Sequence, residues 1–291
     1  MGFETNVAFQ SPDNGVTLPI QLSHGLPSFP LASQVPRTDA YGAGDPITFY
    51  DRNHPNPYSL QFNFGVQHEV RPNLLVEGFY ISNLSHRVLT TYQWNQVRPE
   101  LMGPGNAQQR RPFPQFLDVT GQVAPVGNAS YHALTLRAER RFERGLSFQA
   151  SYTFSKFIDD VGFINEIGDE VGAQDYYNRH ADRGLSSNHI PHRFVFSSVY
   201  ELPFGAGKSL AQNGVLKHIL GGWSLSTYLT VQSGPPFGVT VSSSQANAFS
   251  GSVRPNLVAD PVLPEEQRTR DRYFNPSAFR APPADQFGNS A

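Results

Sequence analysis

The sequence contains no cysteine, and only 3 of its 22 basic residues are lysine. The absence of cysteine excludes a disulfide framework, a cysteine-ligated zinc or iron–sulfur site and a thiol nucleophile. Charged residues make up only 16% of the chain, the formal net charge is -2, and the basic residues are scattered along the sequence. This charge distribution excludes the basic stripe by which nucleic-acid-binding proteins are recognised, so no nucleic-acid partner is expected.

Long apolar segments are also missing from the sequence. The longest apolar runs have about three residues, as at 74–76 and 194–196, whereas a transmembrane helix needs about 20. A helical membrane span is therefore excluded. The first residues, MGFETNVAFQSPDNG, have neither a basic nor an apolar region of the kind found in signal peptides. The 25 glycines and 24 prolines argue against a helical bundle or a coiled coil.

Regular alternation of apolar and polar residues is what the sequence does have. It is most regular over residues 58–70, where Ser, Gln, Asn and Glu separate the apolar positions Tyr58, Leu60, Phe62, Phe64, Val66 and Val70. A period of two predicts a β-strand with two different faces. About thirteen residues is long for a strand, since five or six residues are usual.

Further segments predict five more strands, at residues 74–84, 131–142, 146–154, 193–202 and 223–232. The segment 146–154 separates its faces most cleanly, because every second residue is apolar or aromatic and the residues between are Ser, Gln or Thr. Short turns at 71–73 and 143–145 predict two antiparallel hairpins. A longer connection at 203–222 joins the last two strands and contains a possible short helix at 215–220.

The other connections are much longer, about 46 residues at 85–130, 33 at 158–190 and 58 from residue 234 to the end. Antiparallel strands place the short and the long connections at opposite ends of the sheet. Loops this long are uncommon in compact soluble domains. Long strands with one apolar and one polar face, short turns at one rim and long loops at the other are typical of an antiparallel transmembrane β-barrel of the outer membrane.

Aromatic residues lie at both ends of the predicted strands. Phe142 and Trp223 lie beside the short turns, and Tyr58, Tyr152, Phe154 and Phe194 lie toward the long loops. This placement fits two interfacial girdles of a membrane barrel. A soluble β-sandwich also alternates, but its polar face normally carries more Lys and Glu.

One cluster could suggest a metal site or an enzyme: Asp159, Asp160, Asp175, His180, Asp182, His189 and His192. The cluster has no tight ligand spacing, such as two histidines of an HExxH helix. We expect a polar network that stabilises the loop. The adjacent Ser155 and Lys156 point to opposite faces of a strand, which excludes a simple Ser–Lys nucleophile pair.

Two further motifs lie near the short turns. Residues 205–209 (GAGKS) superficially match a phosphate loop, but the required glycine at 202 is Leu202, so we expect a turn. Arg137, Arg140, Arg141 and Arg144 cluster near the 143–145 turn. For these we expect pairing of Arg137 with Glu139 inside the barrel and an interfacial Arg140. No catalytic, cofactor-binding or metal-binding residue is predicted, and we do not expect an enzyme.

Several phrases together resemble the large TonB-dependent outer-membrane receptors of the Oar-like type. They occur in order and span most of residues 55–289. The phrases are ASYTFSKFIDD (150–160), HRFV (192–195), YELPFGAGK (200–208), GGW (221–223), QSGPPF (232–237), RPN (254–256) and YFNPSAF (273–279).

The resemblance implies a barrel of about 22 strands, a size class that is closed by a plug. It also implies ligand uptake across the outer membrane of a bacterium. The implied partners are outer-membrane lipid and lipopolysaccharide, the TonB energy-coupling complex acting through a missing N-terminal region, and an unidentified transported ligand.

Six or seven strands cannot close so wide a barrel, and open edges in lipid would leave backbone groups unpaired. The sequence also shows no signal peptide, plug domain, TonB box or final strand ending in an aromatic residue. We therefore expect residues 1–291 to be part of the receptor's β-barrel domain, with the plug, the signal peptide and the C-terminal strands absent.

Two other functions remain open at this stage. One is a soluble β-rich carbohydrate-binding or hydrolytic domain that uses the Asp and His residues of the 158–192 loop. The other is an outer-membrane surface protein that does not transport.

Overall fold

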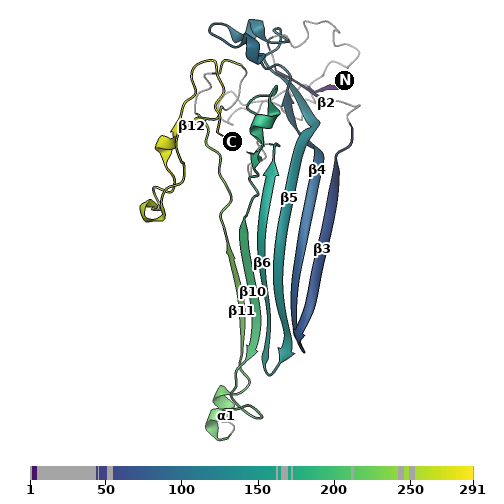
Figure 1. The fold of residues 1–291 in the computed structure, drawn as a ribbon, viewed down its shortest axis with the longest axis vertical. Coiled ribbons are helices and arrows are strands. Elements are labelled where there is room, and N and C mark those ends of the chain that lie inside the picture. Colours follow the sequence, from purple (N-terminus) through teal and green to yellow (C-terminus); the bar gives the residue numbers. More distant parts are fainter. Residues whose placement is uncertain are drawn as a thin grey trace, which may run out of the picture.

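Six long strands form one antiparallel sheet in the computed structural model of the protein (Figure 1). The structure describes residues 2–4, 44, 46–50, 55–161, 163–164, 170–171, 173–210, 213–241, 246–248 and 253–290. In spatial order the long strands are β3 (Tyr58–Arg71), β4 (Leu74–Gln93), β5 (Val119–Glu143), β6 (Leu146–Asp159), β10 (His192–Glu201) and β11 (Ser224–Gln232).

Short strands extend this sheet near the loop end. Strand β2 (Ile47–Tyr50) runs parallel to the start of β5 and pairs with β1 (Gly2–Glu4). Strand β9 (Gly184–Leu185) pairs with the end of β6. Two separate ribbons join β7 (Phe163–Ile164) to β8 (Glu170–Val171) and β12 (Asn256–Leu257) to β13 (Phe279–Arg280).

Among the described residues, the long-loop end also contains five 3-10 helices. They are η2 (Pro99–Leu101), η3 (Ala107–Arg110), η4 (Arg179–Asp182), η5 (Glu265–Gln267) and η6 (Pro276–Ala278). No helix among the residues that the structure describes has both the length and the apolar character needed to cross a membrane.

Tight turns join the strands at the opposite end of the sheet. Between β5 and β6, Glu143 pairs with Leu146, and the two residues of the turn, Arg144 and Gly145, have φ angles of 53° and 83°. Two consecutive positive φ angles are typical of the hairpin turn that matches the twist of the strands. The connection from β10 to β11 lies at the same end and carries the single-turn helix α1 (Val215–Leu220) (Figure 1).

The six predicted strands and the helix at 215–220 are confirmed, but two predicted loop boundaries are wrong. Residues 85–93 belong to β4, and residues 119–130 belong to β5, which has 25 residues. Register shifts occur near Arg87 and again between Thr90 and Tyr92. Each shift interrupts the alternation of faces, so the period of two disappears from the sequence while the pairing of strands continues.

The sheet is open in the part of the chain that the structure describes. Within these residues the outer edges of β3 and β11 have no paired strand. All side chains of β3 and β11 are exposed. The architecture is that of a β-barrel wall rather than a sandwich, because no second sheet covers either face among the described strands. The predicted total of about 22 strands remains a prediction.

Candidate ligand-facing surface and loop rim

The register of the six long strands separates an apolar face from a polar face. One row of paired residues crosses the sheet on the apolar face: Val66, Gly78, Leu136, Tyr152, Phe194 and Val231. The neighbouring row, on the polar face, is Gln67, Glu77, Arg137, Ser151, Val195 and Thr230. The alternation predicted from the sequence is therefore continuous across all six strands.

Large side chains on the apolar face are open to the surroundings. Phe64 is 72% exposed, Val66 63% and Phe154 51%. A contiguous apolar surface of this extent marks a membrane or protein contact. With hydrocarbon on this side, the polar face becomes the lumen wall of a barrel.

Aromatic side chains mark both ends of the apolar face, as predicted. At the turn end, Phe142 is 54% exposed and Trp223 63%. At the loop end, the hydroxyl of Tyr80 lies 2.7 Å from Nδ1 of His132, and the hydroxyl of Tyr152 lies 2.8 Å from Nδ1 of His192. These Tyr–His pairs provide polar partners at the depth where a membrane interface begins.

A charged group lies on the lumen wall near the turn end. Arg137 donates from Nη2 to Glu139 Oε2 at 2.5 Å and from Nη1 to Glu77 Oε2 at 3.3 Å. The predicted pairing of Arg137 with Glu139 is confirmed. Glu77 could not be predicted as a partner, because it becomes a neighbour of Arg137 only through the register of β4 and β5.

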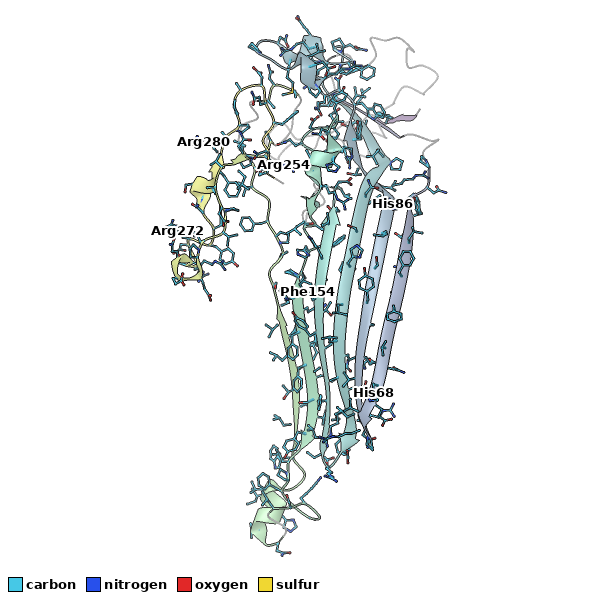
Figure 2. The ribbon with its side chains drawn as sticks, viewed as in Figure 1. His68, His86, Phe154, Arg254, Arg272 and Arg280 are labelled. Carbon is cyan, nitrogen blue, oxygen red and sulfur yellow. The ribbon has the colours of Figure 1, made fainter. Side chains whose placement is uncertain are left out.

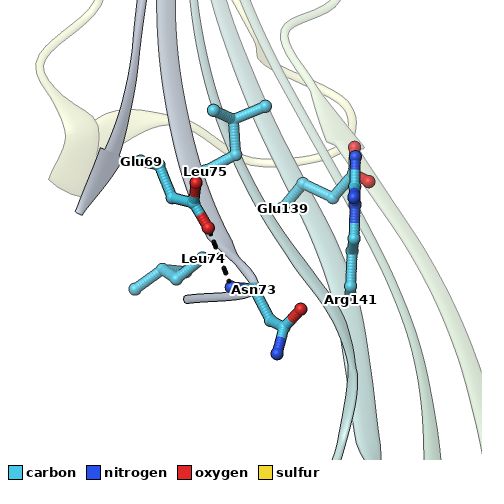
Figure 3. Close-up of a pocket in the computed structure, with 6 residues that line it drawn as sticks. All are labelled: Glu69, Asn73, Leu74, Leu75, Glu139 and Arg141. Atoms are coloured by element: carbon cyan, nitrogen blue, oxygen red, sulfur yellow. Dashed lines mark hydrogen bonds between the residues drawn. The ribbon is translucent and has the colours of Figure 1, made fainter. Parts of the chain in front are cut away.

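A small pocket lies beside this charged group (Figure 3). In it, the backbone N–H of Asn73 donates to Glu69 Oε1 at 3.2 Å. The pocket is lined by Glu69, Asn73, Leu74, Leu75, Glu139 and Arg141. The pocket thus presents two carboxylates, a guanidinium and an amide side chain next to the Arg137 group.

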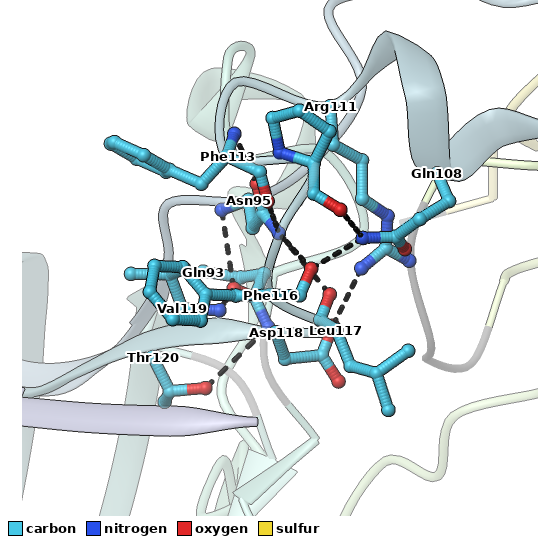
Figure 4. Close-up of polar contacts among 11 residues, drawn as sticks. Gln93, Asn95, Gln108, Arg111, Phe113, Phe116, Leu117, Asp118, Val119 and Thr120 are labelled. Carbon is cyan, nitrogen blue, oxygen red and sulfur yellow. Dashed lines mark hydrogen bonds and ion pairs between the residues drawn. The ribbon is translucent and has the colours of Figure 1, made fainter. Parts of the chain in front are cut away.

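The loop that joins β4 to β5 is held in a defined shape by side-chain amides (Figure 4). Asn95 is fully buried, and its Nδ2 donates to the carbonyl oxygens of Phe113, Phe116 and Leu117 at 2.9–3.2 Å. Its Oδ1 accepts the backbone N–H of Phe113 at 2.8 Å. These bonds satisfy backbone groups that no strand pairs, so they hold the parts of the loop that lie outside η2 and η3.

Three segments of the rim are joined to one another by side chains that the sequence did not identify. Gln96, after β4, donates to Asp175 Oδ1 at 2.7 Å and accepts the backbone N–H of Tyr176 at 2.6 Å. Gln174 accepts the backbone N–H of Arg254 at 2.6 Å and donates to the carbonyl of Gly288 at 2.8 Å. These contacts link residues near 96, 174, 254 and 288, which we call the rim clamp.

A small apolar core lies beside the rim clamp. Val97, Ala246, Ala248 and Val253 are each no more than 1% exposed, and Met102, Ala107 and Phe287 pack against them. The core draws its residues from the β4–β5 loop and from the segment after β11. The rim is thus a packed unit, although its long loops lack sequence periodicity.

The Asp and His residues of the 158–192 region do not meet in one site. Asp160 accepts the backbone N–H of Asn128, Asp175 accepts from Gln96, and Asp182 pairs with Arg254 at 2.8 Å. His192 lies on the apolar face beside Tyr152. Within the described residues, no group of three or more His, Asp or Glu side chains could hold a metal ion. The expected loop-stabilising polar network is what the structure has.

Burial shifts the pKa values of Asp182 and His189, which lie in the connection between β6 and β10. Burial raises the pKa of Asp182 above its ordinary 3.8, although the positive charge of Arg254 opposes the shift. Burial, with a smaller contribution from the Lys156 charge, lowers the pKa of His189 below its ordinary 6.5. The neutral His189 accepts the backbone N–H of Phe157 at its Nδ1 atom, 3.1 Å away. Both groups therefore hold the loop in place.

The sequence GAGKS at 205–209 forms a turn at the short-turn end, as predicted. Gly205 has a φ of 108°. It also lies so close to Gly221 that a Cβ atom at residue 205 would be 2.7 Å from the Gly221 Cα atom. Lys208 pairs with Glu201 at 2.5 Å. This lysine thus contacts the carboxylate of the last residue of β10, the strand that precedes the turn.

Comparison with known families agrees with this architecture. A family model described as "Outer membrane beta barrel domain" matches residues 1–291. Neither the curated proteins nor the solved structures include a significant match. The chain belongs to the outer membrane beta barrel domain family, and it is located in the bacterial outer membrane.

Proposed function

We propose that this chain forms part of the barrel wall of a TonB-dependent receptor of the Oar-like type, which takes up a ligand across the outer membrane. The observation that carries the proposal is the lumen wall, where a row of Gln, Glu, Arg, Ser and Thr side chains lies behind a lipid-facing apolar row. A polar lumen gives a passing ligand or a plug hydrogen-bonding partners. The phrases shared with Oar-like receptors supply the transporter class.

In this proposal the side chains of the lumen wall bind a ligand and catalyse no reaction. Arg137 and the carboxylates Glu77 and Glu139 provide fixed charges on adjacent strands. The pocket next to them adds Glu69 and Arg141. We therefore propose a binding and transport role, without an enzymatic step and without a cofactor. The TonB complex is the proposed energy source.

Uptake assays in the bacterium that encodes the chain test this function. Cells with and without the gene are supplied with radiolabelled iron–siderophore complexes, cobalamin, oligosaccharides and peptides, with and without a protonophore. We expect loss of the gene to abolish uptake of one class, and the protonophore to have the same effect in wild-type cells. Wild-type uptake of the whole panel by the deletion strain would refute the proposal.

The packed rim favours one alternative, an outer-membrane surface protein that does not transport. A rim held by Gln96, Gln174 and Arg254 offers a stable surface for a partner outside the cell. This alternative predicts unchanged uptake in the deletion strain together with reduced attachment of cells to a surface. The same pair of strains therefore distinguishes the two functions.

A further inference from the structure

We propose that the apolar face carries, at its long-loop end, a binding site for the phosphate groups of a phosphorylated glycolipid in the outer leaflet. The site consists of Arg87, Lys156 and Arg183, which we call the cationic cluster. The inference depends on the location of the protein in the outer membrane and not on ligand uptake. Its test can therefore fail while the proposed function stands, and the reverse also holds.

Arg87 reaches the apolar face through an irregularity in β4. By alternation from Ser85, a residue at 87 should face the lumen. The register shifts between His86 and Val88, and Arg87 has a φ of 57°. A bulge of this kind redirects a side chain. The guanidinium carbon of Arg87 accordingly lies 5.6 Å from the ring centroid of Tyr58, on the lipid side.

Lys156 and Arg183 reach the same face from other elements. Lys156 lies on β6 directly opposite His132, in the row that continues to Ser82 and Phe62. Arg183 precedes β9, and its Nη2 donates to Ser130 Oγ at 3.4 Å. Ser130 lies opposite Leu84 in the next row on the apolar face. All three cations are exposed.

The three charges are close enough to contact one headgroup. Tyr58, Ser130 and Lys156 lie in three successive rows of the apolar face. Successive rows on one face are about 6.8 Å apart along a strand, and neighbouring strands are about 4.8 Å apart. The cluster therefore covers a span of about 20 Å from Tyr58 to Lys156, with Ser130 and its partner Arg183 between them. The long, flexible Arg and Lys side chains can reach toward one another within this span. A headgroup with two phosphates fits such a span better than one with a single phosphate.

None of the cations is neutralised by an acid in the part of the chain that the structure describes. The ion pairs found there include neither Arg87, Lys156 nor Arg183. The carboxylate nearest in register, Asp160, is engaged by Arg179 at 3.6 Å and by the backbone of Asn128. Among the described residues, the cluster thus carries positive charge with which no carboxylate forms an ion pair.

The depth of the cluster matches the outer membrane interface. From Phe142 in the turn-end girdle to His132 beside Lys156 there are ten residues of β5. At about 3.3 Å per residue and a tilt of about 40°, this segment covers about 25 Å along the membrane normal, which is the height of the apolar band of a barrel. Figure 2 shows His68 near the turn end, and Phe154 and His86 successively nearer the loops. The cluster therefore lies at the headgroup level of the leaflet on the long-loop side, which is the extracellular one.

Histidine, amide and hydroxyl side chains complete the site between the cations. His86 lies 3.1 Å from the Asn128 Oδ1 atom, and its ring packs against Tyr58 with centroids 5.2 Å apart. The hydroxyl of Tyr80 lies 2.7 Å from His132. Hydroxyl and amide groups at this level can bind the sugar of a glycolipid, whereas the apolar rows toward the turn end contact its acyl chains.

The binding test uses the complete gene product in nanodiscs and three probes. The probes are bisphosphoryl lipid A, monophosphoryl lipid A and phosphatidylglycerol, and retention is measured by native mass spectrometry. We expect bisphosphoryl lipid A to be retained at least tenfold more than phosphatidylglycerol. The triple variant Arg87→Gln, Lys156→Gln, Arg183→Gln is expected to lose this preference. The control Arg144→Gln, which removes an exposed cation at the turn end, should keep it.

Each outcome decides the proposal. Equal retention of bisphosphoryl lipid A and phosphatidylglycerol would overturn it in favour of general attraction to anionic lipid. An unchanged lipid preference in the triple variant would show that the cluster is not the site.

If the triple variant does not assemble, Lys156→Glu replaces it. Assembly is checked by heat-modifiable migration. This exposed single substitution is expected to reduce bisphosphoryl lipid A retention at least threefold, and no reduction would equally overturn the site.

Discussion

Gly288 lies against the backbone of Arg254 so closely that any Cβ atom at residue 288 would collide with the Arg254 carbonyl group. The Gly288 carbonyl also accepts from Gln174 at 2.8 Å, and Gln174 in turn accepts the backbone N–H of Arg254. Gly288 thus allows the segments around residues 254 and 288 to pack together and both to bind Gln174. This contact is the tightest point of the rim clamp.

Gly288→Ala is expected to open the rim clamp. Because the added methyl group meets backbone atoms that cannot move aside, we expect a local destabilisation of about 1–3 kcal/mol. Hydrogen exchange should accelerate at residues 174–176 and 254–257, while the long strands stay protected. Gly234→Ala is the matched control, since its Cβ atom would meet nothing within 4 Å. Equal exchange in both variants would contradict the clamp.

Arginine substitutions on adjacent residues of β6 should separate the two faces. Ala150 lies on the apolar face between Ala138 and Phe196, whereas Gln149 lies on the polar face. An arginine facing lipid near the midplane costs about 2–4 kcal/mol. In the complete gene product we expect Ala150→Arg to reduce the heat-modifiable barrel sharply and Gln149→Arg to be tolerated. Identical behaviour of the two variants would refute the assignment of faces.

Removal of the lumen guanidinium should leave two carboxylates without their shared partner. Arg137→Ala is expected to destabilise the barrel by about 1 kcal/mol, a modest amount because the Arg137 side chain is 32% exposed and solvent screens the pair. Glu139→Gln in the Arg137→Ala background should recover part of the loss. Urea unfolding of the four members of this cycle measures the coupling. A coupling of zero would show that the ion pair contributes nothing to stability.

Acidification should loosen the segment that follows η4. The folded-state pKa of His189 is lowered, so its contribution to stability is present above pH 6.5 and is lost as the pH falls through the lower, folded-state value. Protonation also removes the acceptor for the Phe157 N–H. We expect the protection factor of the Phe157 amide, which corrects for the intrinsic pH dependence of exchange, to fall below pH 6. In the His189→Gln variant this protection factor should not change with pH in the same range. A pH-dependent His189→Gln variant would assign the effect to another group.

The strands that face lipid on one side could be predicted because each face has a single chemical character. In residues 146–154 the alternation has no exceptions, and the structure reproduces both its faces and its hairpin turn. The prediction failed for residues 85–93, where the Arg87 bulge shifts the faces by one residue. Pro125, in the segment 85–130 that was predicted to be a loop, lies opposite Leu89 in the sheet.

The rim could not be predicted, since its order depends on contacts between residues far apart in the sequence. Gln96 and Asp175 are separated by 79 residues, and Gln174 and Gly288 by 114. No local pattern marks a glutamine that will bind a distant backbone. The sequence did identify Asp175 and Asp182 as loop-stabilising groups, but it did not identify their partners Gln96 and Arg254.

The rim clamp mechanically couples three connections at the loop end of the sheet. Gln96, Gln174 and Arg254 belong to three connections that leave the sheet at different strands, and each depends on another for its hydrogen bonds. Displacement of residues 174–176 would break hydrogen bonds to both of the other connections at once. Residues 174–176 are therefore the mechanical hub of the rim, because both neighbouring connections are bound to them.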